Sequence, residues 1–507
     1  MPGWLKHLLG GDKEGTAGGS QKPRPVSKNL AENLDYVKLR LGFGTSFDVL
    51  VRRFKVANHD AAVIYLDGMV KDQVVTKVLS VLMSVKTVSG DPVDYVSAIS
   101  VPYGETDKVA DQEQAIHQIL AGPVVLFIDG ADQALVIDAR KYPGRQPTNA
   151  KMERVLRGPQ DGFVETLVDN TVLVRRRLRD PQLRIEMHSL GLRSRTDVAL
   201  LYIEDVANPD LVGEVRRRLE AVDAGTLTMA EHAVAEFLQR RRDWWNPFPV
   251  VRYTERPDVV AEHLQEGHVA VMVDTSPPAL LMPVTIFHFL QHPEEYHEDT
   301  AVGTYSRWVR LLAVLLSWIF TPVYVALASR PRLLPAALRF LGPKKPGPIP
   351  LAIQFIFGEL GIDLMRLALL NTPSAMSNSL GFIGAILLGQ EAERTGLISP
   401  EAVLYTALAA VGSFTTPSLE LAMAIRLGRM LMLVLLAAFG LPGLLVGFAI
   451  NVAVVGSTRS FDVPYLWPLL PFDGQALGAL LVRKPIPLNR WRLKVLRPRD
   501  PDEQPAG

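Results

Sequence analysis

The spacing of hydrophobic positions divides the chain into two kinds of sequence. Up to about residue 310, and again after residue 483, charged residues are frequent and hydrophobic runs are short, whereas the stretch between holds long runs without an ionisable side chain. Short runs suit the strands and helices of a water-soluble fold, and uncharged runs of about 20 residues suit helices that cross a bilayer. The pattern predicts a large polar N-terminal region followed by an all-α transmembrane bundle with several spans.

The polar region alternates β-branched runs of strand length with helical patterns, which is typical of an α/β or α+β fold. The same order occurs twice: a strand that ends in an acidic turn, a helix, and then a strand that leads through a turn into another apolar run. The segments are 61–68, 71–83, 122–129 and 133–140 in the first copy, and 197–205, 209–222, 267–274 and 279–285 in the second. We expect two similar tandem subdomains, at about 45–150 and 190–290, with a linking helix within 161–179.

Four apolar stretches are predicted to span the membrane, because a hydrocarbon core of about 30 Å needs about 20 helical residues. They are 311–329, 349–370, 402–419 and 430–458, the last one tilted or kinked at Pro442. A shorter apolar stretch, 380–390, follows a polar break at 371–378 and indicates a re-entrant or half-length helix.

The second expected span carries three charged residues, Glu359, Asp363 and Arg366. Their spacing places all three on one helical face. A charged group near the bilayer centre costs at least about 2.5 to 3.5 kcal/mol, so this face is expected to meet partner helices or a water-filled path rather than lipid. Two interpretations stay open: an intramembrane polar path or gate, and an internal ion pair that only holds the bundle together.

A second polar interruption, at 413–418, falls within the third expected span. Thr415, Thr416 and Pro417 can break the helix there and free backbone carbonyls toward a cavity. A proline kink whose free carbonyls are satisfied by the two threonines is an equally economical interpretation.

Composition narrows the classes of function. The net charge is +1, so the chain lacks the broad positive field of nucleic-acid binders, and no nucleic-acid partner is expected. The chain has no cysteine, which excludes disulfides and thiolate chemistry. We expect a disordered tail at 1–40, soluble subdomains at 41–150 and 151–300, a transmembrane domain at 301–475 and a basic cytoplasmic tail at 476–507.

Candidate catalytic or ligand-binding motifs in the polar region are weak. Gly42-Phe43-Gly44 does not complete a dinucleotide fingerprint and is interpreted as a turn. The arginine-rich stretch 175–184 is interpreted as a solvated helix face, or as a contact for anionic headgroups or acidic partner surfaces, rather than as a nucleic-acid patch. Paired catalytic carboxylates, a nucleophile elbow and a phosphate loop are not evident, so the chain is not expected to be an enzyme or to hold a cofactor.

Histidines and acids before the first span could be imagined as metal ligands, since His288 and His292 share a helical face. The full set is His288, His292, His297, Glu294 and Glu295. Proline 293 interrupts any helix, and the order does not match a known zinc motif. An interfacial linker that enters the membrane is the favoured interpretation, and no metal site is expected.

The two indications of membrane orientation conflict. The positive-inside tendency places the basic C-terminal tail in the cytoplasm, and four spans then place the soluble region there as well. The same topology puts the loop 330–348 outside, although it holds basic residues and no acid.

Several collinear stretches resemble one family of bacterial membrane proteins. They are Asp129-Gly130, DARKYPG at 138–144, RGPQDGFVET at 157–166, NPDLV at 208–212, YTERPD at 253–258, GELGID at 358–363 and SFDVPY at 460–465. Over roughly residues 45–475 they resemble the GerA-type A subunits of bacterial spore germinant receptors. Stretches at 140–145, 245–249, 274–277 and 292–296 look most like the stage V sporulation protein AF branch of that family.

The resemblance implies a spore germination protein of the spore inner membrane, acting as a subunit of an oligomeric, channel-forming complex that promotes ion release. Its partners would be the lipid bilayer, further copies of the chain and other spore germination membrane subunits. Glu359, Asp363 and Arg366 would then lie near a conduction path. A secondary transporter and a non-conducting receptor scaffold stay open as alternatives.

Overall fold

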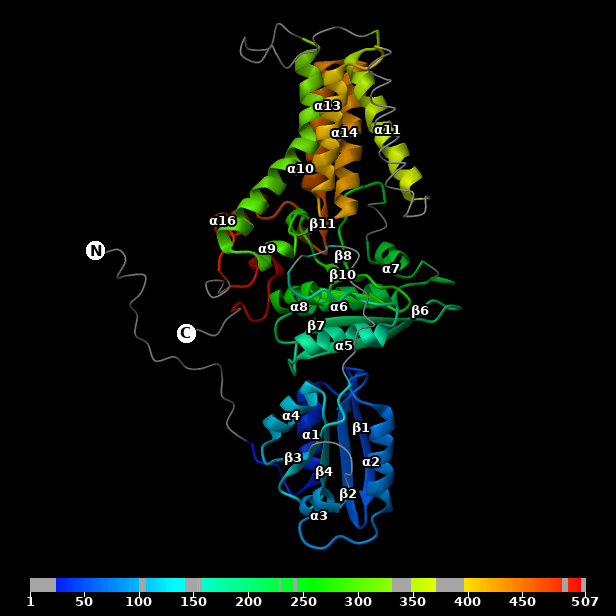
Figure 1. Ribbon diagram of the computed structural model, residues 1–507, viewed down its shortest axis with the longest axis vertical. Coiled ribbons are helices and arrows are strands. Elements are labelled where there is room, and N and C mark those ends of the chain that lie inside the picture. Colours follow the sequence, from blue (N-terminus) through cyan, green and yellow to red (C-terminus); the bar gives the residue numbers. More distant parts are fainter. Residues whose placement is uncertain are drawn as a thin grey trace, which may run out of the picture. The chain divides into compact units, whose positions relative to one another are not determined.

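The computed structural model describes residues 24–99, 106–141, 153, 155, 157–227, 229–239, 244–330, 348–370, 396–485 and 491–502. The chain forms two compact units (Figure 1). The first, the soluble unit, comprises 1–240, 253–283 and 484–507, and the second, the membrane unit, comprises 241–252 and 284–483. The expected half-length helix at 380–390 lies outside the described residues.

The first subdomain of the soluble unit is a five-stranded sheet in the order β1-β2-β4-β5-β3. Its elements are α1 (Leu30–Leu41), β1 (Val49–Val56), β2 (His59–Leu66), α2 (Asp72–Ser84), α3 (Pro92–Ile99), β3 (Thr106–Val109), α4 (Gln112–Ala121), β4 (Val124–Ile128) and β5 (Ala134–Ile137). Side chains of α1 and α4 pack on one face of the sheet, and those of α2 and α3 pack on the other. Because both faces are covered, the central strands are apolar at nearly every position.

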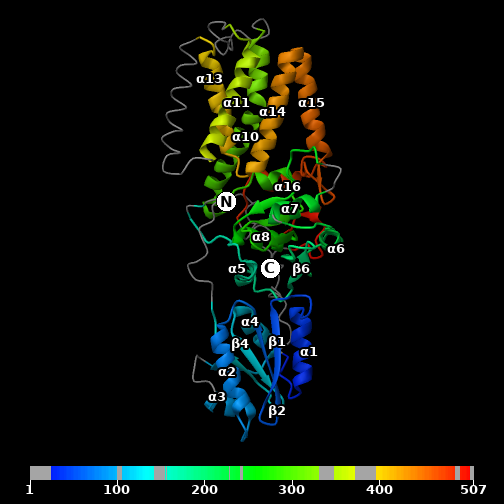
Figure 2. The ribbon, with the colours of Figure 1, turned by 90° about the vertical axis from the view of Figure 1, so that its right-hand side faces the viewer.

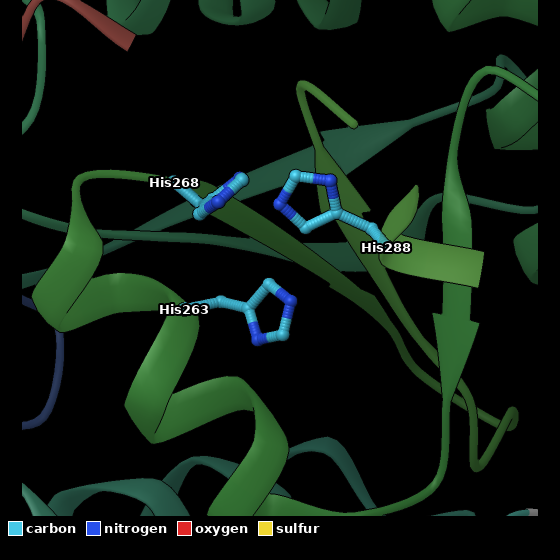
Figure 3. Close-up of side chains that lie close together, drawn as sticks. All are labelled: His263, His268 and His288. Atoms are coloured by element: carbon cyan, nitrogen blue, oxygen red, sulfur yellow. The ribbon is translucent and has the colours of Figure 1, made fainter. Parts of the chain in front are cut away.

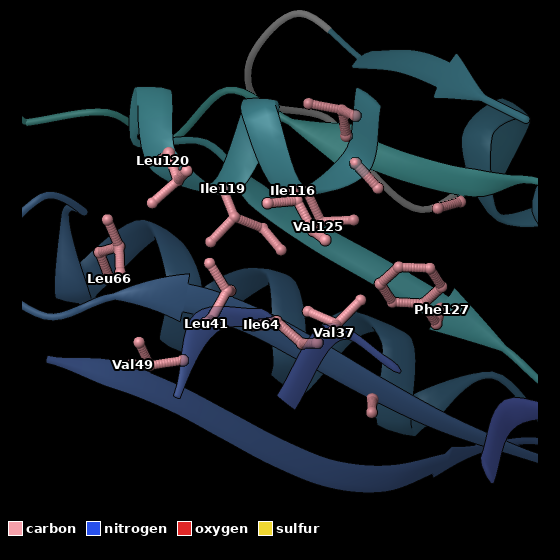
Figure 4. Close-up of a cluster of buried hydrophobic side chains, with 14 of the residues drawn as sticks. Val37, Leu41, Val49, Ile64, Leu66, Ile116, Ile119, Leu120, Val125 and Phe127 are labelled. Carbon is pink, nitrogen blue, oxygen red and sulfur yellow. The ribbon is translucent and has the colours of Figure 1, made fainter. Parts of the chain in front are cut away.

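Successive side chains along the central strands of this subdomain belong to two different core clusters, one on each face of the sheet. Ile64 on β2 and Phe127 on β4 face α1 and α4 (Figure 4), while their neighbours Val63 and Leu126 face α2 and α3. Ala62 pairs with Phe127 in the antiparallel register of β2 and β4. A shift of one residue would exchange the two faces, so the helices on both sides fix the register.

The second subdomain has the same strand order, β6-β7-β9-β10-β8. Its elements are α5 (Leu167–Arg177), β6 (Leu183–Leu190), β7 (Thr196–Ile203), α6 (Pro209–Glu220), α7 (Ala230–Leu238), β8 (Arg252–Thr254), α8 (Pro257–Glu266), β9 (Val269–Val273) and β10 (Ala279–Met282). Each element of the first subdomain thus has a counterpart in the second. The predicted pair of similar tandem subdomains is confirmed.

Local hydrogen bonds show that α1 and α5 are equivalent helices. The Asn33 side chain accepts from the Ser27 amide at 2.8 Å and donates to the Ser27 carbonyl at 2.6 Å, and Asn170 makes the same pair with Val164 at the same two distances. The expectation of a linking helix at 161–179 is therefore incomplete: α5 occupies that stretch, but it is the first helix of the second subdomain.

The expected disordered tail at 1–40 is wrong from Leu30 onward. Asn29 caps α1 by accepting a hydrogen bond from the Ala31 amide, and Leu34 and Val37 are buried under the sheet. Gly42 ends the helix in the left-handed conformation, with φ of 65°. Its carbonyl accepts hydrogen bonds from the Thr45 and Ser46 amides, which closes a turn. The interpretation of Gly42-Phe43-Gly44 as a turn is confirmed.

We expect Asn33→Ala and Asn170→Ala to destabilise their own subdomains to a similar extent. Each substitution removes the pair of hydrogen bonds to one partly buried backbone amide and carbonyl, and the loss of this shared pair costs about 1 to 3 kcal/mol. Asn33→Ala also removes the 2.7 Å bond that Gln112 Nε2 donates to Asn33 Oδ1. Hydrogen–deuterium exchange of the full chain would measure the loss of protection in β2 and β4 for one variant and in β7 and β9 for the other. Unequal responses, with one variant unaffected, would contradict the equivalence of the two helices.

The C-terminal segment belongs to the soluble unit from Lys484 onward. The Arg499 amide donates to the Val206 carbonyl at 2.9 Å, and the Arg492 guanidinium donates to the Gln265 carbonyl at 2.6 Å. Leu496, in the short 3-10 helix η6 (Lys494–Leu496), is buried. Part of the basic tail is thus fixed on the second subdomain.

The membrane unit is a bundle of helices (Figures 1 and 2). Its elements are η2 (Ile286–Phe289), α9 (Glu294–His297), α10 (Thr300–Ala328), α11 (Leu351–Leu370), α13 (Pro400–Phe414), α14 (Leu419–Phe439), α15 (Leu441–Ser457), β11 (Arg459–Ser460), β12 (Val463–Pro464) and α16 (Gly474–Leu481). Of the described helices, α10 and α14 are long and apolar enough to cross a membrane, and α15 is a shorter apolar helix.

The expectation of a single span at 430–458 is wrong. The chain turns back at Gly440, which has a φ of 68°, so α14 and α15 form a hairpin (Figure 2). A Cβ at Gly443 would lie 1.9 Å from the Leu435 carbonyl oxygen, and one at Gly447 would lie 3.1 Å from the Met432 Cα. Small residues therefore let the two helices approach closely, as is common between helices in a bilayer.

Candidate functional site in the membrane helices

Close packing of α10, α11, α13 and α14 positions a group of charged side chains inside the membrane unit (Figure 1). A Cβ at Gly358 on α11 would touch Thr406 on α13 at 3.0 Å, and a Cβ at Gly412 on α13 would lie 2.7 Å from the Ala313 carbonyl oxygen on α10. The two glycines thus let α13 approach α11 and α10 closely. Such approach leaves no room for lipid between these helices.

Glu359 of α11 is the central acid of the group. Its carboxylate oxygen Oε2 lies 2.7 Å from Arg429 Nη2 and 3.3 Å from Arg426 Nε, both on α14. Arg426 Nη2 also donates to the Glu359 carbonyl at 2.8 Å, and Arg429 Nη1 donates to the Ser317 carbonyl on α10. One acid and two arginines therefore connect three helices.

The pairing at Glu359 is sealed from solvent. Glu359 and Arg429 are each 1% exposed, and Arg426 is 7% exposed. Glu359 Oε1 and the Nε atoms of Arg426 and Arg429 have no hydrogen-bond partner among the described residues, although Arg426 Nε is within ion-pair distance of Oε2. The ion pairs link the helices, but these three buried atoms remain without a hydrogen bond among the described residues.

Asp363, one helical turn further along α11, lies in a more open position. Arg426 Nη1 contacts its carboxylate at 2.9 Å, and 32% of the Asp363 side chain is exposed. Arg366, the next charged residue on this face, is also partly exposed and contacts the Met423 sulfur on α14. The charged face thus runs from a sealed end at Glu359 to an open end at Asp363 and Arg366.

The structure adds Arg426 and Arg429 to the three residues predicted from sequence. The sequence prediction missed them because it accepted a span only where charged residues were few. It therefore ended one span at 419, began the next at 430, and left 420–429 outside both. The signal was present: both arginines stand three residues apart among apolar residues, which places them on one helical face.

Thr415, Thr416 and Pro417 lie between α13 and α14 rather than within one span. Helix α13 ends at Phe414, where the Thr415 hydroxyl donates to the Gly412 carbonyl at 2.7 Å, and α14 begins at Leu419 after a Ser418 cap. Helix α13 therefore ends five residues before the C-terminal end that was expected for the third span at 402–419. A role for these residues in opening a cavity stays a prediction.

The acidic linker before α10, which was weighed as a metal site, makes its described contacts with protein groups. Glu295 is 1% exposed and pairs with two arginines of α10: Arg307 Nε contacts it at 2.8 Å, and Arg310 contacts its other oxygen. His288 bonds to Thr285 at the start of η2. The Nδ1 atom of His292 accepts from the Glu294 amide at 3.2 Å.

Two histidines of the soluble unit lie close together. His263, in the last turn of α8, and His268, just before β9, have ring centroids 5.0 Å apart and are both buried (Figure 3). His263 Nδ1 is 2.8 Å from the Val259 carbonyl, one turn earlier in the same helix. This contact directs one nitrogen of the pair toward the backbone.

The interpretation of the arginine run as a solvated face is wrong for two of its members. Arg175 is 2% exposed and pairs with Asp48 of the first subdomain at 2.9 Å, with a second contact at 3.2 Å. Arg184 is 4% exposed and pairs with Glu204. Both arginines are buried because acids that are distant in sequence lie beside them, which no local pattern shows.

A second buried carboxylate of the soluble unit is that of Glu186 on β6, which pairs with Arg216 on α6. Burial raises its pKa, but the His188 ring 3.5 Å away and hydrogen bonds from Arg216 and Tyr202 outweigh this effect and hold the pKa at about 2, below its ordinary value of 4.5. Because the folded-state pKa is the lower one, the stabilisation is present above about pH 4.5 and is lost as the pH falls toward 2.

We therefore expect Glu186→Gln to lower the stability of β6 and β7 at pH 7 by on the order of 1 to 2 kcal/mol, less than the full pKa shift implies because solvent screens part of the group. The variant should also lose stability less steeply than the wild type between about pH 5 and pH 2. Hydrogen exchange at several pH values measures both effects, with the exposed Glu220→Gln as control. A wild-type pH profile in the variant would refute the assignment.

The fold and the buried charge cluster define a class: a membrane protein with two tandem α+β subdomains and a separate helical domain whose helices are linked by buried ion pairs. A model of the family described as Bacillus/Clostridium GerA spore germination protein matches residues 37–495. The chain belongs to this family, and the predicted resemblance is confirmed. The family is one of non-enzymatic receptors, which also confirms that the chain is not an enzyme.

Individual relatives cover nearly the whole chain. Stage V sporulation protein AF of Bacillus subtilis (strain 168) is 42% identical over 484 residues, which are 95% of this chain and 98% of that protein. Spore germination protein KA of the same organism is 29% identical over 475 residues, 92% of this chain and 86% of that protein. The N-terminal domain of the A subunit of the Bacillus megaterium spore germinant receptor GerK3 matches with a TM-score of 0.41 and 26% identity, over 52% of this chain and 97% of that domain.

Proposed function

We propose that the chain is a subunit of an oligomeric, germinant-receptor-like complex in the spore inner membrane, and that the assembled membrane units conduct ions and promote ion release during germination. Membership of a spore germination family supports the setting. Asp363 supports the conduction, because 32% of its side chain stays exposed even though Arg426 contacts it, and an exposed part of a carboxylate on a membrane helix calls for water or a further polar group.

The two ends of the charged face have different roles in this proposal. Glu359 and Arg429 are sealed and hold α10, α11 and α14 together. Asp363 and Arg366 are partly exposed and face the path. The path forms when further copies of the chain, or other germination subunits, cover the open side of α11. The soluble unit and the C-terminal tail are proposed to lie in the cytoplasm.

Flux from vesicles tests this function. The full chain, purified from membranes with its partners and reconstituted, is expected to form oligomers and to release ions at a rate that rises with the ion gradient without saturating. Saturable, substrate-dependent counterflow would favour a secondary transporter instead. Intact oligomers that release no ions under any germination stimulus would favour a non-conducting scaffold.

A further inference from the structure

A short helix of the membrane unit, α16, carries an apolar surface that the described protein leaves uncovered. None of its eight residues is buried, and none is charged. The preceding segment adds exposed large side chains, with Leu470 61% and Phe472 75% exposed, and Val482 after the helix is 48% exposed. Uncovered apolar surface of this kind marks a contact with a protein partner or with lipid.

Contacts with α10 fix the depth of α16 relative to the membrane. Arg307 Nη1 donates to the Leu480 carbonyl at 2.8 Å, and Trp308 Nε1 donates to the Leu481 carbonyl at 2.6 Å. The uncharged stretch of α10 begins at Leu311. At 1.5 Å per residue, Trp308 lies only about 5 Å along the axis from that point.

The surroundings of α16 have the composition of a membrane–water interface. Tyr305 and Trp308 on α10 are 70% and 56% exposed, and tyrosine and tryptophan concentrate at headgroup level. The exposed Leu312, one turn above Trp308, continues the apolar surface into the span. Arg483, two residues after the end of the helix, is buried and donates to the Tyr296 carbonyl at 2.9 Å.

We propose that residues 469–482 form an interfacial foot that lies in the headgroup region of the bilayer. Continuity with the lipid-facing side of α10 selects lipid as the partner. Helices that lie in the interface bury their apolar face about 5 to 10 Å into the boundary between headgroups and acyl chains. Because Arg307 and Trp308 hold the end of α16, the foot fixes the height of α10 in the bilayer.

Single-cysteine labelling tests this proposal, since the chain has no native cysteine. The full-length variants Phe472→Cys and Leu470→Cys are each labelled with a polarity-sensitive fluorophore and reconstituted in phosphatidylcholine vesicles. The vesicles contain lipids that carry a quenching nitroxide either near the headgroup (shallow) or far along the acyl chain (deep). Met83→Cys in the soluble unit serves as the water control and Val323→Cys, within the uncharged stretch of α10, as the deep-lipid control, because both native side chains are exposed.

We expect both foot labels to emit at shorter wavelength than the Met83 label, and to be quenched more by the shallow nitroxide than by the deep one. Emission like that of the Met83 label would overturn the proposal. A blue-shifted label that no nitroxide lipid quenches would also overturn it, because another protein chain would then cover the foot. So would quenching as deep as that of the Val323 label. None of these outcomes depends on ion flux.

Discussion

Replacing Glu359 by glutamine is expected to unfold the membrane unit at much lower denaturant than the wild type requires. The substitution leaves Arg429, which is 1% exposed, and Arg426, which is 7% exposed, without their shared carboxylate. Removing one partner of a buried ion pair costs about 3 to 5 kcal/mol, because the remaining charge stays desolvated. The loss should be seen as dissociation of α11 from α10 and α14.

Denaturation of the full chain in detergent, followed by the exposure of α14 amides to hydrogen exchange, measures this effect. Glu420→Gln is the control, since Glu420 lies in the first turn of α14, the helix whose exchange is followed, and its side chain bonds only to Ser418 among the contacts described. It should cost about 1 kcal/mol or less. Equal stability of the two variants would contradict the role of Glu359, and partial recovery in the Glu359→Gln, Arg429→Gln double variant would support it.

The second large effect is expected at the buried pair between the two soluble subdomains. Arg175→Ala should destabilise the soluble unit by about 3 to 5 kcal/mol, because it leaves Asp48, 4% exposed, as an uncompensated buried charge. Arg175 also donates to the Asp180 and Leu183 carbonyls at 3.2 Å each. Those acceptors lose their partner as well.

Arg179→Ala is the matched control for this substitution, because Arg179 lies in the same basic run but is exposed. Its effect should stay within about 0.5 kcal/mol. Protection of β1 and β6 against hydrogen exchange reports the stability on both sides of the junction. Similar protection in the two variants would mean that the run is solvated, as the sequence pattern alone predicts.

Sequence patterns predicted the soluble fold well because its strands are buried on both faces. A run such as that of β4 is apolar at every position and ends at an aspartate, so its type and end are visible locally. Helix α1 was missed because polar residues surround its few buried ones. Its place in the fold depends on the Asn33 hydrogen bonds, which have a recognisable counterpart only at Asn170.

The site could be predicted only in part for a related reason. Helical spacing was enough to align Glu359, Asp363 and Arg366 on one face. Their partners stand on another helix, and the pairing of α11 with α14 depends on tertiary packing that one sequence does not reveal. Tertiary packing also decides why Glu359 is buried while Asp363, one turn further along the same helix, is partly exposed.

The permeability of reconstituted Asp363→Asn tests the central claim most directly. Neutralising this carboxylate removes negative charge from the open end of the face and leaves the nearby Arg366 and Arg426 in excess. With Glu420→Gln as control and with oligomers confirmed to be intact, we predict a severalfold lower ratio of cation to anion flux. Flux of unchanged rate and selectivity in intact Asp363→Asn oligomers would contradict an ion path along α11.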